Sequence, residues 1–491
     1  MSTRAWLRPL ALLMFAVACG GGTPDKKKKR RSGKRKRAKM RKQEAQKADD
    51  ANVAVKTSSQ TVERKGNAPA DAPNVLLVSL DTLRADVLPP YGGRTDITPT
   101  IAALAKDGVV FQKSWAQAPS TSPTHASMFT SALPADHGLM GTNGRLPEEW
   151  LTLAEHMQSY GIRTWASTSS VRFALGVQLN QGFEEYAVYS YGSQTEKSNK
   201  ALDVALAAID KDPDRPWFGF VHLMDVHAPY DVPEPHQSRY LQGPTTVPPD
   251  KTVNFLHRYR LSPEKVSPRK LRDVHAMYDG GVSFVDTRIE ALWGAVQKLD
   301  RPTVIVITSD HGEAFFEKNF LGHGTFVHEP IVRVPLIFWG PGIIPQGGHR
   351  VTLAQSIDLF PTLSTIVGLP VPDGLMGEDL TPVLRGEGEK LGRTVISQSK
   401  KRMCLVRDTP EGLFKVVVNG KGKRPRVYDL REDPHEQTDI SAKHSQLAED
   451  WAAELRTVAF SKHRTEAETW EMTDEEREAL EAIGYMDADD H

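Results

Sequence analysis

The sequence predicts an α/β protein in which a large mixed, mostly parallel sheet lies between helices. Two apolar runs, Asn74–Asp81 (NVLLVSLD) and Thr303–His311 (TVIVITSDH), are typical of strands that helices cover on both faces. Candidate strands and helices alternate from Pro73 to about Leu369, as in a parallel sheet. Both runs reach a carboxylate at their ends, and ligands of such sheets gather beyond the carboxyl ends of the strands. A functional site is therefore expected at that edge.

The elements around these runs follow from turn residues and apolar periodicity. Pro is favoured at the first position of a helix and Gly just past its end. A helix is therefore expected over Pro99–Asp107, between Thr98 and Gly108. Gly280-Gly281 inside a long helical pattern predicts a break. The Pro-rich stretch 229–249 is expected to be a long loop over the site. The other expected elements are helices at 152–160, 267–298 and 357–367 and strands at 162–167, 217–223 and 335–339.

The pattern changes after Pro370. Short strand-like runs alternate with turn residues such as Asn419-Gly420, which indicates a small antiparallel sheet. We assign residues 73–370 to a catalytic domain and 371–491 to a C-terminal sheet with helices that belongs to the same fold. The expected strands are 394–398, 403–407, 414–419 and 426–430, and the expected helices are 442–460 and 474–483.

Residues 1–19 have the layout of a secretory signal. A short basic start precedes an apolar stretch, Leu10–Val17, which is too short to span a bilayer comfortably. The following Ala18-Cys19-Gly20 resembles a bacterial lipobox, so we expect cleavage before Cys19 and lipidation of its thiol. An ordinary signal peptide is the alternative. The protein is then expected to be an exported lipoprotein anchored to a membrane of the cell envelope.

Residues 20–72 are expected to form a basic, disordered tether. Of the 17 residues in Lys26–Lys42, 13 are Lys or Arg, a density that repels itself and cannot bury a core. Taken alone the tract also fits nucleic-acid binding, but after a lipid anchor it favours anionic lipid headgroups. Residues 73–491 carry 43 basic and 56 acidic residues, so no nucleic-acid surface is expected there.

The chain has two cysteines, Cys19 and Cys404. If Cys19 is lipidated, no intramolecular disulfide can form, and stability must come from the core. Cys404 lies in a strand-like run and is expected to be a small buried apolar side chain.

Carboxylate, imidazole and hydroxyl groups are expected to meet at the edge of the sheet. Asp81, Asp310 and His311 end the two apolar runs, and the segment Ala118–Thr130 places two hydroxyls, Thr121 and Ser122, next to a helix start. This combination indicates a metal-assisted nucleophilic site. The structural alternative is that each Asp only caps the turn that follows its strand.

Several segments follow one another in a characteristic order. They are NVLLVSLDTLRAD, APSTSPTHASMFTSALPADHG, HLMDVHAPY, TSDHGE, LGHG with VRVPLIFWGPG, and VYDLREDPHEQTDIS. In this order they resemble the sulfatase family of the alkaline phosphatase-like superfamily, over about Pro73 to Ser441. The resemblance implies a large mixed sheet between helices, a smaller four-stranded C-terminal sheet, and hydrolysis of sulfuric or phosphoric esters.

The resemblance also implies a divalent metal held by Asp81, Asp310 and His311. Many sulfatases have a second Asp where this chain has Thr82, and Asp-Asn where it has Asp310-His311. One fewer carboxylate and one nitrogen ligand shift the expected ion from Ca²⁺ toward Mn²⁺ or Zn²⁺.

The chain departs from the family at the nucleophile. Sulfatases have a Cys or Ser two positions before a Pro, which is oxidised to formylglycine, and an Arg two positions after that Pro. Alignment on Pro123 places Thr121 at the nucleophile and His125 at the Arg position. Oxidation of Thr would give a ketone instead of an aldehyde, so no formylglycine is expected.

This departure bears on the substrate. The aldehyde hydrate lets a sulfated enzyme release sulfate by breaking its own C–O bond, and a Thr sulfate ester lacks that exit. Water can instead attack a Thr phosphate ester in line. The residue chemistry thus favours phosphate or phosphonate esters, and Thr121 fits a plain helix cap equally well.

Further histidines complete the set by resemblance. His227 matches a family His that protonates the leaving oxygen or holds the anionic group, and His323 stands where relatives carry a Lys or His that contacts it. For His222 a structural role is as plausible as a functional one. Glu313 is expected to hydrogen-bond locally. Two arginines either clamp an oxyanion or pair with acids: Arg84 and Arg333.

The sequence therefore predicts a metal-dependent hydrolase of sulfate or of phosphate or phosphonate esters, with Thr121 as the nucleophile. Two alternatives remain open. One is a transferase that passes a phosphoryl-linked group to an envelope lipid or glycan, and the other is an inactive family member retained as a surface binding protein. The expected partners are the ester substrate and, through the anchor and tether, an anionic membrane surface.

Overall fold

The computed structural model describes residues 54–56, 62–141, 143–459, 465 and 468–484, which fall in one compact unit. The expected signal peptide, the lipobox and most of the basic tether lie outside the described residues. The described end of the tether contacts the folded unit, because the Lys65 N–H donates to the carbonyl oxygen of Ser159 at 2.9 Å. Within the described ranges, no helix combines the length and apolar character that a bilayer crossing requires.

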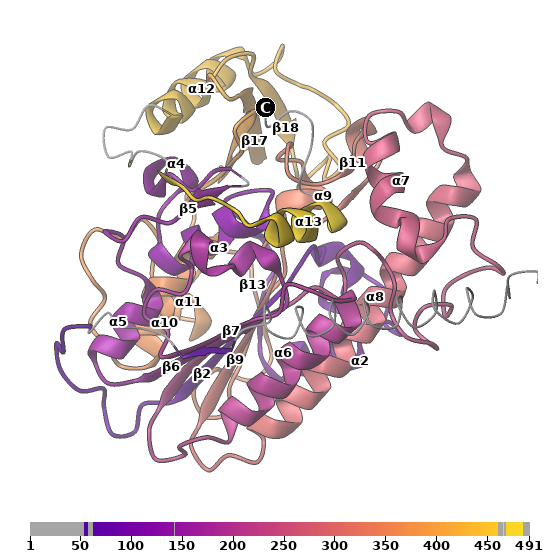
Figure 1. The fold of residues 1–491 in the computed structure, drawn as a ribbon. Coiled ribbons are helices and arrows are strands. Elements are labelled where there is room, and N and C mark those ends of the chain that lie inside the picture. The colour runs from indigo at the N-terminus through magenta and orange to yellow at the C-terminus, as the bar shows by residue number, and fades with distance from the viewer. Residues whose placement is uncertain (1–53, 57–61, 142, 460–464, 466–467, 485–491) are drawn as a thin grey trace, which may run out of the picture. The chain divides into compact units, whose positions relative to one another are not determined.

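A nine-stranded sheet forms the centre of the unit, in the order β1-β7-β6-β8-β2-β9-β12-β3-β13 (Figure 1). Strand β2 (Asn74–Leu80) pairs in parallel with β8 (Trp217–Leu223) on one side and with β9 (Thr303–Thr308) on the other. β12 (Leu336–Trp339) is antiparallel to both of its neighbours. The predicted mixed, mostly parallel sheet is confirmed. The other strands are β1 (Ala54–Lys56), β3 (Val109–Phe111), β6 (Arg163–Thr168), β7 (Glu185–Val188) and β13 (Gly348–Arg350).

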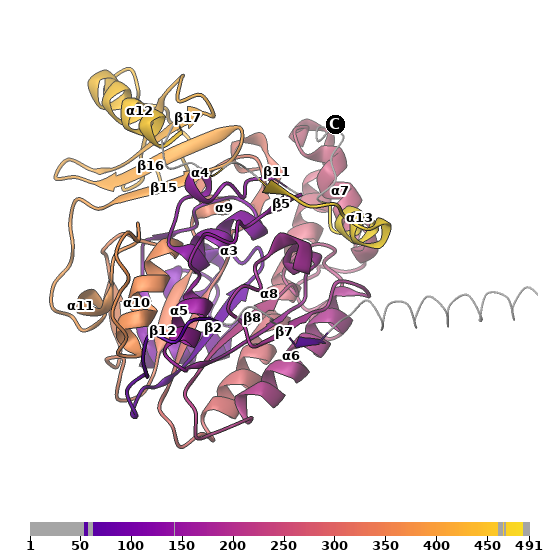
Figure 2. The ribbon, with the colours of Figure 1, turned by 60° about the vertical axis from the view of Figure 1, so that its left-hand side comes forward.

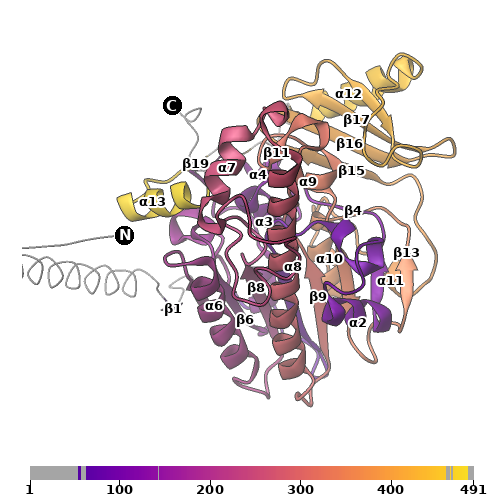
Figure 3. The ribbon, with the colours of Figure 1, turned by 90° about the vertical axis from the view of Figure 1, so that its right-hand side faces the viewer.

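Helices cover both faces of the sheet (Figures 2 and 3). Successive residues of β2 point to opposite faces, so Leu76 and Val78 pack on one side and Val75 and Leu77 on the other. Every residue of β2, β8 and β9 is buried, which explains their continuous apolar runs. The first face is covered by α2 (Pro99–Asp107), α6 (Gln194–Ile209) and α8 (Pro268–Val296), and the second by α3 (Thr121–Thr130), α5 (Leu153–Ser159) and α10 (Leu359–Ile366).

Helix α8 runs without the break expected at Gly280-Gly281, so that prediction is wrong. A Cβ at Gly280 would lie 2.5 Å from the carbonyl oxygen of His236, and one at Gly281 would lie 2.6 Å from that of Asp225. The two glycines therefore let the loop backbone after β8 approach the helix closely. They serve packing and leave the helix intact.

The C-terminal residues form the predicted antiparallel sheet. Strands β15 (Thr394–Gln398), β16 (Arg402–Asp408), β17 (Leu413–Asn419) and β18 (Arg426–Asp429) pair in chain order. Helix α12 (Ser445–Ala459) covers one face, and Cys404 is buried on the other, as expected.

The last described helix, α13 (Asp474–Ala482), packs against the larger part of the unit. Its Leu480 and the following Ile483 join a cluster with Val171 and Met224, close to the carboxyl end of β8. The remaining short elements are α4 (Pro134–His137), α7 (Thr252–Tyr259), α9 (Glu329–Val332), α11 (Thr381–Leu384), β4 (Ser114–Trp115), β5 (Gly144–Arg145), β10 (Ala314–Phe315), β11 (Leu321–Gly322), β14 (Ala354–Gln355) and β19 (Glu468–Thr469).

Candidate active site

Three neighbouring strands bring polar side chains to one edge of the sheet. Asp81 directly follows β2, Asp310 and His311 follow β9, and His222 lies near the end of β8. Ligand atoms of Asp81, Asp310 and His311 all lie within 4.8 Å of one another, and these side chains are fully buried. The structure thus brings together the three residues that the sequence suggested as metal ligands.

The donor atoms of this cluster fit a divalent cation. Oδ1 of Asp81 and Oδ2 of Asp310 are buried, and neither has a hydrogen-bond partner among the described residues. Nε2 of His311 lies 3.4 Å from Oδ2 of Asp310 and 3.8 Å from Oδ1 of Asp81. Burying carboxylate oxygens without partners is costly, and a cation bound among them would remove that cost. Burial alone would lower the pKa of His311, but the carboxylates of Asp310 and Asp81 raise it, so positive charge is favoured here.

Thr121 is the first residue of α3 and faces the cluster. Its hydroxyl oxygen lies 3.4 Å from Oδ2 of Asp81, to which it donates, and 3.4 Å from Nε2 of His311. The side chain of Ser120, which precedes the helix, makes no capping hydrogen bond. The N-terminus of a helix favours a bound anion, so the nucleophile candidate stands where an anionic ester would bind.

His125 lies one turn further along α3, behind Thr121. Its Nδ1 is 2.8 Å from the carbonyl oxygen of Thr121 and its Nε2 is 2.9 Å from the hydroxyl of Ser79. The ring packs edge-on against Phe173, with 4.7 Å between ring centroids. Burial lowers the pKa of His125 to about 3. Both ring nitrogens are engaged, so His125 supports the first turn of α3.

His222, which the sequence left undecided, lies against the cluster. Its Nε2 is 3.2 Å from Oδ2 of Asp81, and neither ring nitrogen makes a hydrogen bond within the described part of the chain. Together with His125 and Asp310 it forms a second set of ligand atoms within 4.8 Å of one another. Burial lowers the pKa of His222 to about 4. This geometry favours a functional role.

His227 and His323 lie on the other side of the cluster. The ring centroid of His323 is 4.4 Å from that of His311 and 5.1 Å from that of His227. Nδ1 of His323 is 2.9 Å from Oε1 of Glu313, whose Oε2 accepts a hydrogen bond from the Tyr230 hydroxyl at 3.0 Å. Glu313 therefore hydrogen-bonds locally, as expected. Burial lowers the pKa of both histidines, that of His227 to about 4.

The turn after β2 is strained. Thr82 has a φ of +58°, which a β-branched residue rarely adopts. Its carbonyl oxygen accepts a hydrogen bond from the Tyr278 hydroxyl at 2.9 Å, and its N–H donates to Oδ1 of Asp310 at 3.4 Å. Thr82 thus adopts a left-handed conformation at the position where many sulfatases carry a second Asp, and its backbone hydrogen bonds connect this turn to Tyr278 and Asp310.

Lys197 is a charged neighbour that sequence reasoning missed. It is buried on α6, and burial lowers its pKa to about 8 although Asp81 and Asp225 favour its charged form. α6 was not predicted, because its buried face mixes polar residues such as Ser198 with small alanines such as Ala201 and has few large apolar side chains. Apolar periodicity therefore did not reveal this helix, and without the helix Lys197 could not be predicted to lie near the site.

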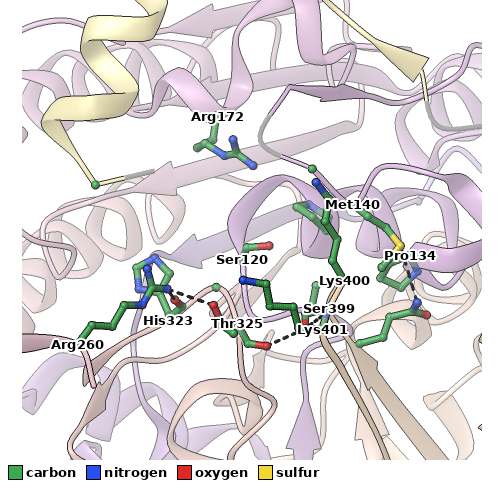
Figure 4. Close-up of a pocket in the computed structure, with 16 residues that line it drawn as sticks. Ser120, Pro134, Met140, Arg172, Arg260, His323, Thr325, Ser399, Lys400 and Lys401 are labelled. Atoms are coloured by element: carbon green, nitrogen blue, oxygen red, sulfur yellow. Dashed lines mark hydrogen bonds between the residues drawn. The ribbon is translucent and has the colours of Figure 1, made fainter. Parts of the chain in front are cut away.

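A cavity of about 170 Å³ opens beside the start of α3 (Figure 4). Ser120, Pro123 and His323 line it, so it adjoins the cluster. The guanidinium of Arg84, one of the two arginines that the sequence suggested as an oxyanion clamp, forms ion pairs with the carboxylates of Asp86 and Glu317, each with an N···O distance of 2.7 Å. The cavity is lined further by Ala118, Pro134, Met140, Gly141, Arg172, Arg260, Gly324, Thr325, Gln398, Ser399, Lys400, Lys401 and Gly484. Of the two arginines considered from the sequence, neither Arg84 nor Arg333 is among the described lining residues.

Comparison with known proteins identifies the family. Residues 73–369, more than half of the chain, match the Sulfatase family model, and residues 313–461 match the model of the N-sulphoglucosamine sulphohydrolase C-terminal region. The Delta 4,5-hexuronate-2-O-sulfatase of Bacteroides thetaiotaomicron is 23% identical over 434 residues, which cover 78% of this chain and 89% of that protein.

Solved structures share the fold. A phosphonate monoester hydrolase of Agrobacterium radiobacter superposes with a TM-score of 0.64 at 22% identity, covering 82% of this chain and 98% of that one. A 2-O GAG sulfatase superposes with a TM-score of 0.66 at 20% identity, covering 84% and 97%. The chain therefore belongs to the sulfatase family and is a hydrolase of sulfuric or phosphoric esters.

Proposed function

We propose that the protein uses the Thr121 hydroxyl as a nucleophile, with metal assistance, and that it prefers phosphate or phosphonate esters to sulfate esters. The observation that carries the proposal is the position of this hydroxyl at the start of α3, 3.4 Å from both Asp81 and His311. The fold neighbours include both a phosphonate monoester hydrolase and a sulfatase, so the scaffold accommodates either chemistry.

Asp81, Asp310 and His311 would hold the metal, with His222 as a further donor. Two carboxylates with imidazole nitrogens suit Mn²⁺ or Zn²⁺ better than Ca²⁺. A bound cation of this kind supplies Lewis-acid stabilisation of the negative charge on the ester oxygens. The buried carboxylate oxygens, which lack hydrogen-bond partners among the described residues, support this assignment.

The proposed reaction has two displacement steps. Thr121 gives its proton to Asp81, its oxygen bonds to phosphorus, and the bond from phosphorus to the leaving oxygen breaks. A bound anionic ester favours the protonated forms of His227 and His323, and His227 then protonates the leaving oxygen. Water next attacks phosphorus and gives a proton to His227, the bond from phosphorus to the Thr121 oxygen breaks, and Asp81 returns its proton to that oxygen, which restores the hydroxyl.

His125 is proposed to be a positioning residue in this reaction. Its hydrogen bonds to the Thr121 carbonyl and to Ser79 connect the first turn of α3 to β2, the strand that ends in Asp81. His125→Asn is expected to displace the nucleophile and lower kcat more than it raises KM. His137→Asn, which affects a buried histidine further along the same chain segment, is the matched control.

The deciding experiment compares matched aryl esters. Purified protein with Mn²⁺, Zn²⁺ or Ca²⁺ is assayed with 4-nitrophenyl sulfate, 4-nitrophenyl phosphate, bis(4-nitrophenyl) phosphate and 4-nitrophenyl phenylphosphonate. We expect kcat/KM for a phosphorus ester to exceed that for the sulfate by about 10²-fold or more. Thr121→Ala should abolish turnover, whereas Thr121→Ser should retain part of it. A strong preference for sulfate would overturn the argument from Thr121.

Product analysis separates a hydrolase from a transferase. Turnover in the presence of a glycerol or lipid acceptor should release inorganic phosphate or free phosphonate. If the phosphoryl-linked group is recovered on the acceptor instead, the transferase alternative is correct.

We also propose that residues 1–72 anchor the enzyme to the cell envelope. The support is the sequence alone: the lipobox-like Ala18-Cys19-Gly20 and the basic run Lys26–Lys42. Lipid labelling of the full chain should mark Cys19 and should be lost in Cys19→Ser. A mature N-terminus at any other residue would refute the lipoprotein assignment.

A further inference from the structure

The cavity beside the start of α3 is basic, although the body of the protein is not. Four of its lining side chains are cationic: Arg172, Arg260, Lys400 and Lys401. Apart from His323, these are all the charged side chains among its described lining residues. Residues 73–491 as a whole carry 56 acidic and 43 basic residues, so this concentration of positive charge is local.

The four cations come from three distant segments. Arg172 belongs to the short helix η3 (Val171–Phe173), Arg260 ends α7, and Lys400 and Lys401 form the turn between β15 and β16. In Figure 4, Arg172 lies on one side of Ser120, Arg260 with His323 on another, and the two lysines on a third. The side chain of Arg172 is 3% exposed, so its charge lies within the cavity wall.

Hydrogen bonds hold this wall at a fixed place relative to the nucleophile. The N–H of Gly324 donates to the carbonyl oxygen of Pro119 at 2.8 Å, two residues before Thr121. Arg260 donates to the carbonyl oxygen of His323, and its guanidinium stacks on the Phe320 ring at 5.1 Å.

The lysine turn is tied to the same loop. The Ser399 hydroxyl donates to the carbonyl oxygen of Thr325 at 2.7 Å. On the opposite side Lys400 lies against Gly141, where a Cβ would come within 3.1 Å of its ammonium nitrogen. The basic wall and the reaction centre are therefore parts of one rigid arrangement.

We propose that this cavity is a second anion subsite, so that the substrate carries an additional sulfate, phosphate or carboxylate on its leaving group. The inference rests on the proposed function, because it takes the ester to bind at Thr121. A cavity of about 170 Å³ holds several water volumes and therefore one such anionic group. Arg and Lys at its wall pair with sulfate, phosphate and carboxylate oxygens alike. The enzyme is thus specific for esters that are at least doubly anionic.

The test uses two esters that differ only in the second charge. 2-Naphthyl phenylphosphonate is compared with the same ester bearing a sulfonate at position 6 of the naphthyl ring. The wild-type ratio of kcat/KM, sulfonated over unsubstituted, is compared with that of Lys400→Gln/Lys401→Gln. Lys421→Gln/Lys423→Gln is the control, because these lysines are exposed in the turn between β17 and β18 of the same sheet.

We expect the sulfonated ester to be preferred and the ratio to fall about five- to tenfold in Lys400→Gln/Lys401→Gln, mainly through KM. The control should keep the wild-type ratio, and added KCl should reduce it. Each ratio compares two esters on one enzyme. The intrinsic difference in reactivity between the two leaving groups is therefore the same for every variant and cancels when the ratios are compared. An unchanged ratio in Lys400→Gln/Lys401→Gln, or an equal fall in the control, overturns the subsite.

A binding measurement keeps the subsite testable if neither ester is turned over. Absence of turnover would refute the proposed function. Calorimetric titration with naphthalene-2,6-disulfonate and naphthalene-2-sulfonate would then decide whether the anion subsite exists. Tighter binding of the disulfonate, lost in Lys400→Gln/Lys401→Gln, supports the subsite. Equal affinity for both probes refutes it.

Discussion

Two buried clusters of ionisable side chains differ in how their charges are compensated. One cluster lies under the C-terminal sheet, and the other lies at the edge of the large sheet. Nζ of Lys415 lies 2.7 Å from Oε1 of Glu329 and 2.9 Å from Oε1 of Glu436. The indole N–H of Trp115 also donates to Oε1 of Glu329, at 3.0 Å. At the edge of the large sheet, by contrast, Nε2 of His311 lies 3.8 Å from Oδ1 of Asp81 and 3.4 Å from Oδ2 of Asp310, and neither oxygen has a hydrogen-bond partner within the described residues.

This difference distinguishes structural from functional burial. Both clusters lie out of contact with water, where an unmet charge is costly. In the Lys415 cluster the side chains compensate one another's charges and connect β17 to α9, so the cluster has a structural role. In the Asp81 cluster the described residues leave one oxygen of each aspartate without a hydrogen bond, which is consistent with the proposed metal ion. Substitutions in the two clusters should therefore affect different properties.

The largest expected effect is on activity, from Asp310→Ala. Loss of a proposed metal ligand should lower kcat/KM by about 10³-fold. The free energy of unfolding of the metal-free protein should change little, because removal of a buried carboxylate offsets the loss of the hydrogen bonds that its Oδ1 accepts from the N–H groups of Thr82 and His311. Steady-state kinetics, urea unfolding and elemental analysis check this, with Asp300→Ala as an exposed control. Unchanged metal content in Asp310→Ala would contradict the assignment.

Lys415→Met should have the opposite profile. It leaves two buried carboxylates without their cation, so the free energy of unfolding should fall by about 3–5 kcal/mol. Bound metal should not change. Lys415→Met/Glu329→Gln/Glu436→Gln should recover much of the loss, because no uncompensated charge then remains. Lys423→Met, exposed in the same sheet, is the control in urea unfolding, and a loss below about 1 kcal/mol for Lys415→Met would show that the cluster is not structural.

Acid should weaken the completed cluster through Glu436. Burial alone would raise the pKa of this carboxyl, but Lys415 and His328 lower it to about 2. A folded-state pKa below the unfolded value of about 4.5 means that the stabilisation is complete above pH 4.5 and is lost as the pH falls toward 2. The loss should approach about 3 kcal/mol. Urea unfolding between pH 5 and pH 3 should show a steeper decline for wild type than for Glu436→Gln, and parallel curves would exclude this carboxyl as the cause.

The smallest effects concern how the fold supports the site from α8. Gly281→Ala should lower the free energy of unfolding by about 1–3 kcal/mol, because the new Cβ meets the backbone of Asp225. It should also lower kcat, since Asp225 lies two residues before His227. Gly294→Ala, in the same helix with nothing within 4 Å, should instead raise stability by up to about 1 kcal/mol. Equal effects of the two substitutions would mean that Gly281 has no packing role.

The sequence predicted best what depends on continuous burial. Strands β2, β8 and β9 are apolar on both faces, so their positions, and the edge where Asp81 and Asp310 meet, followed directly. The helix break at Gly280-Gly281 was wrong because a tertiary contact, not backbone freedom, explains the glycines. Prediction failed where small and polar residues make much of the buried face, as in α6.

The cavity illustrates a second limit of prediction from the sequence. Arg172, Arg260 and Lys400 are separated by long stretches of sequence, and each is unremarkable in its own segment. Only the folding of three loops against the start of α3 makes them neighbours. Likewise, the resemblance placed His125 at a family Arg position, but only the structure shows both of its nitrogens engaged behind Thr121.

The packing of α13 has a consequence for the order of events during synthesis. The nucleophile and all three proposed metal ligands have been made once the ribosome has passed His311, at about two-thirds of the 491 residues. The cavity wall includes Lys400 and, just after α13, Gly484. The chain therefore contains the whole Asp81 cluster before it contains the residues that complete the cavity wall, so the proposed reaction centre and the proposed anion subsite are assembled from successive parts of the sequence.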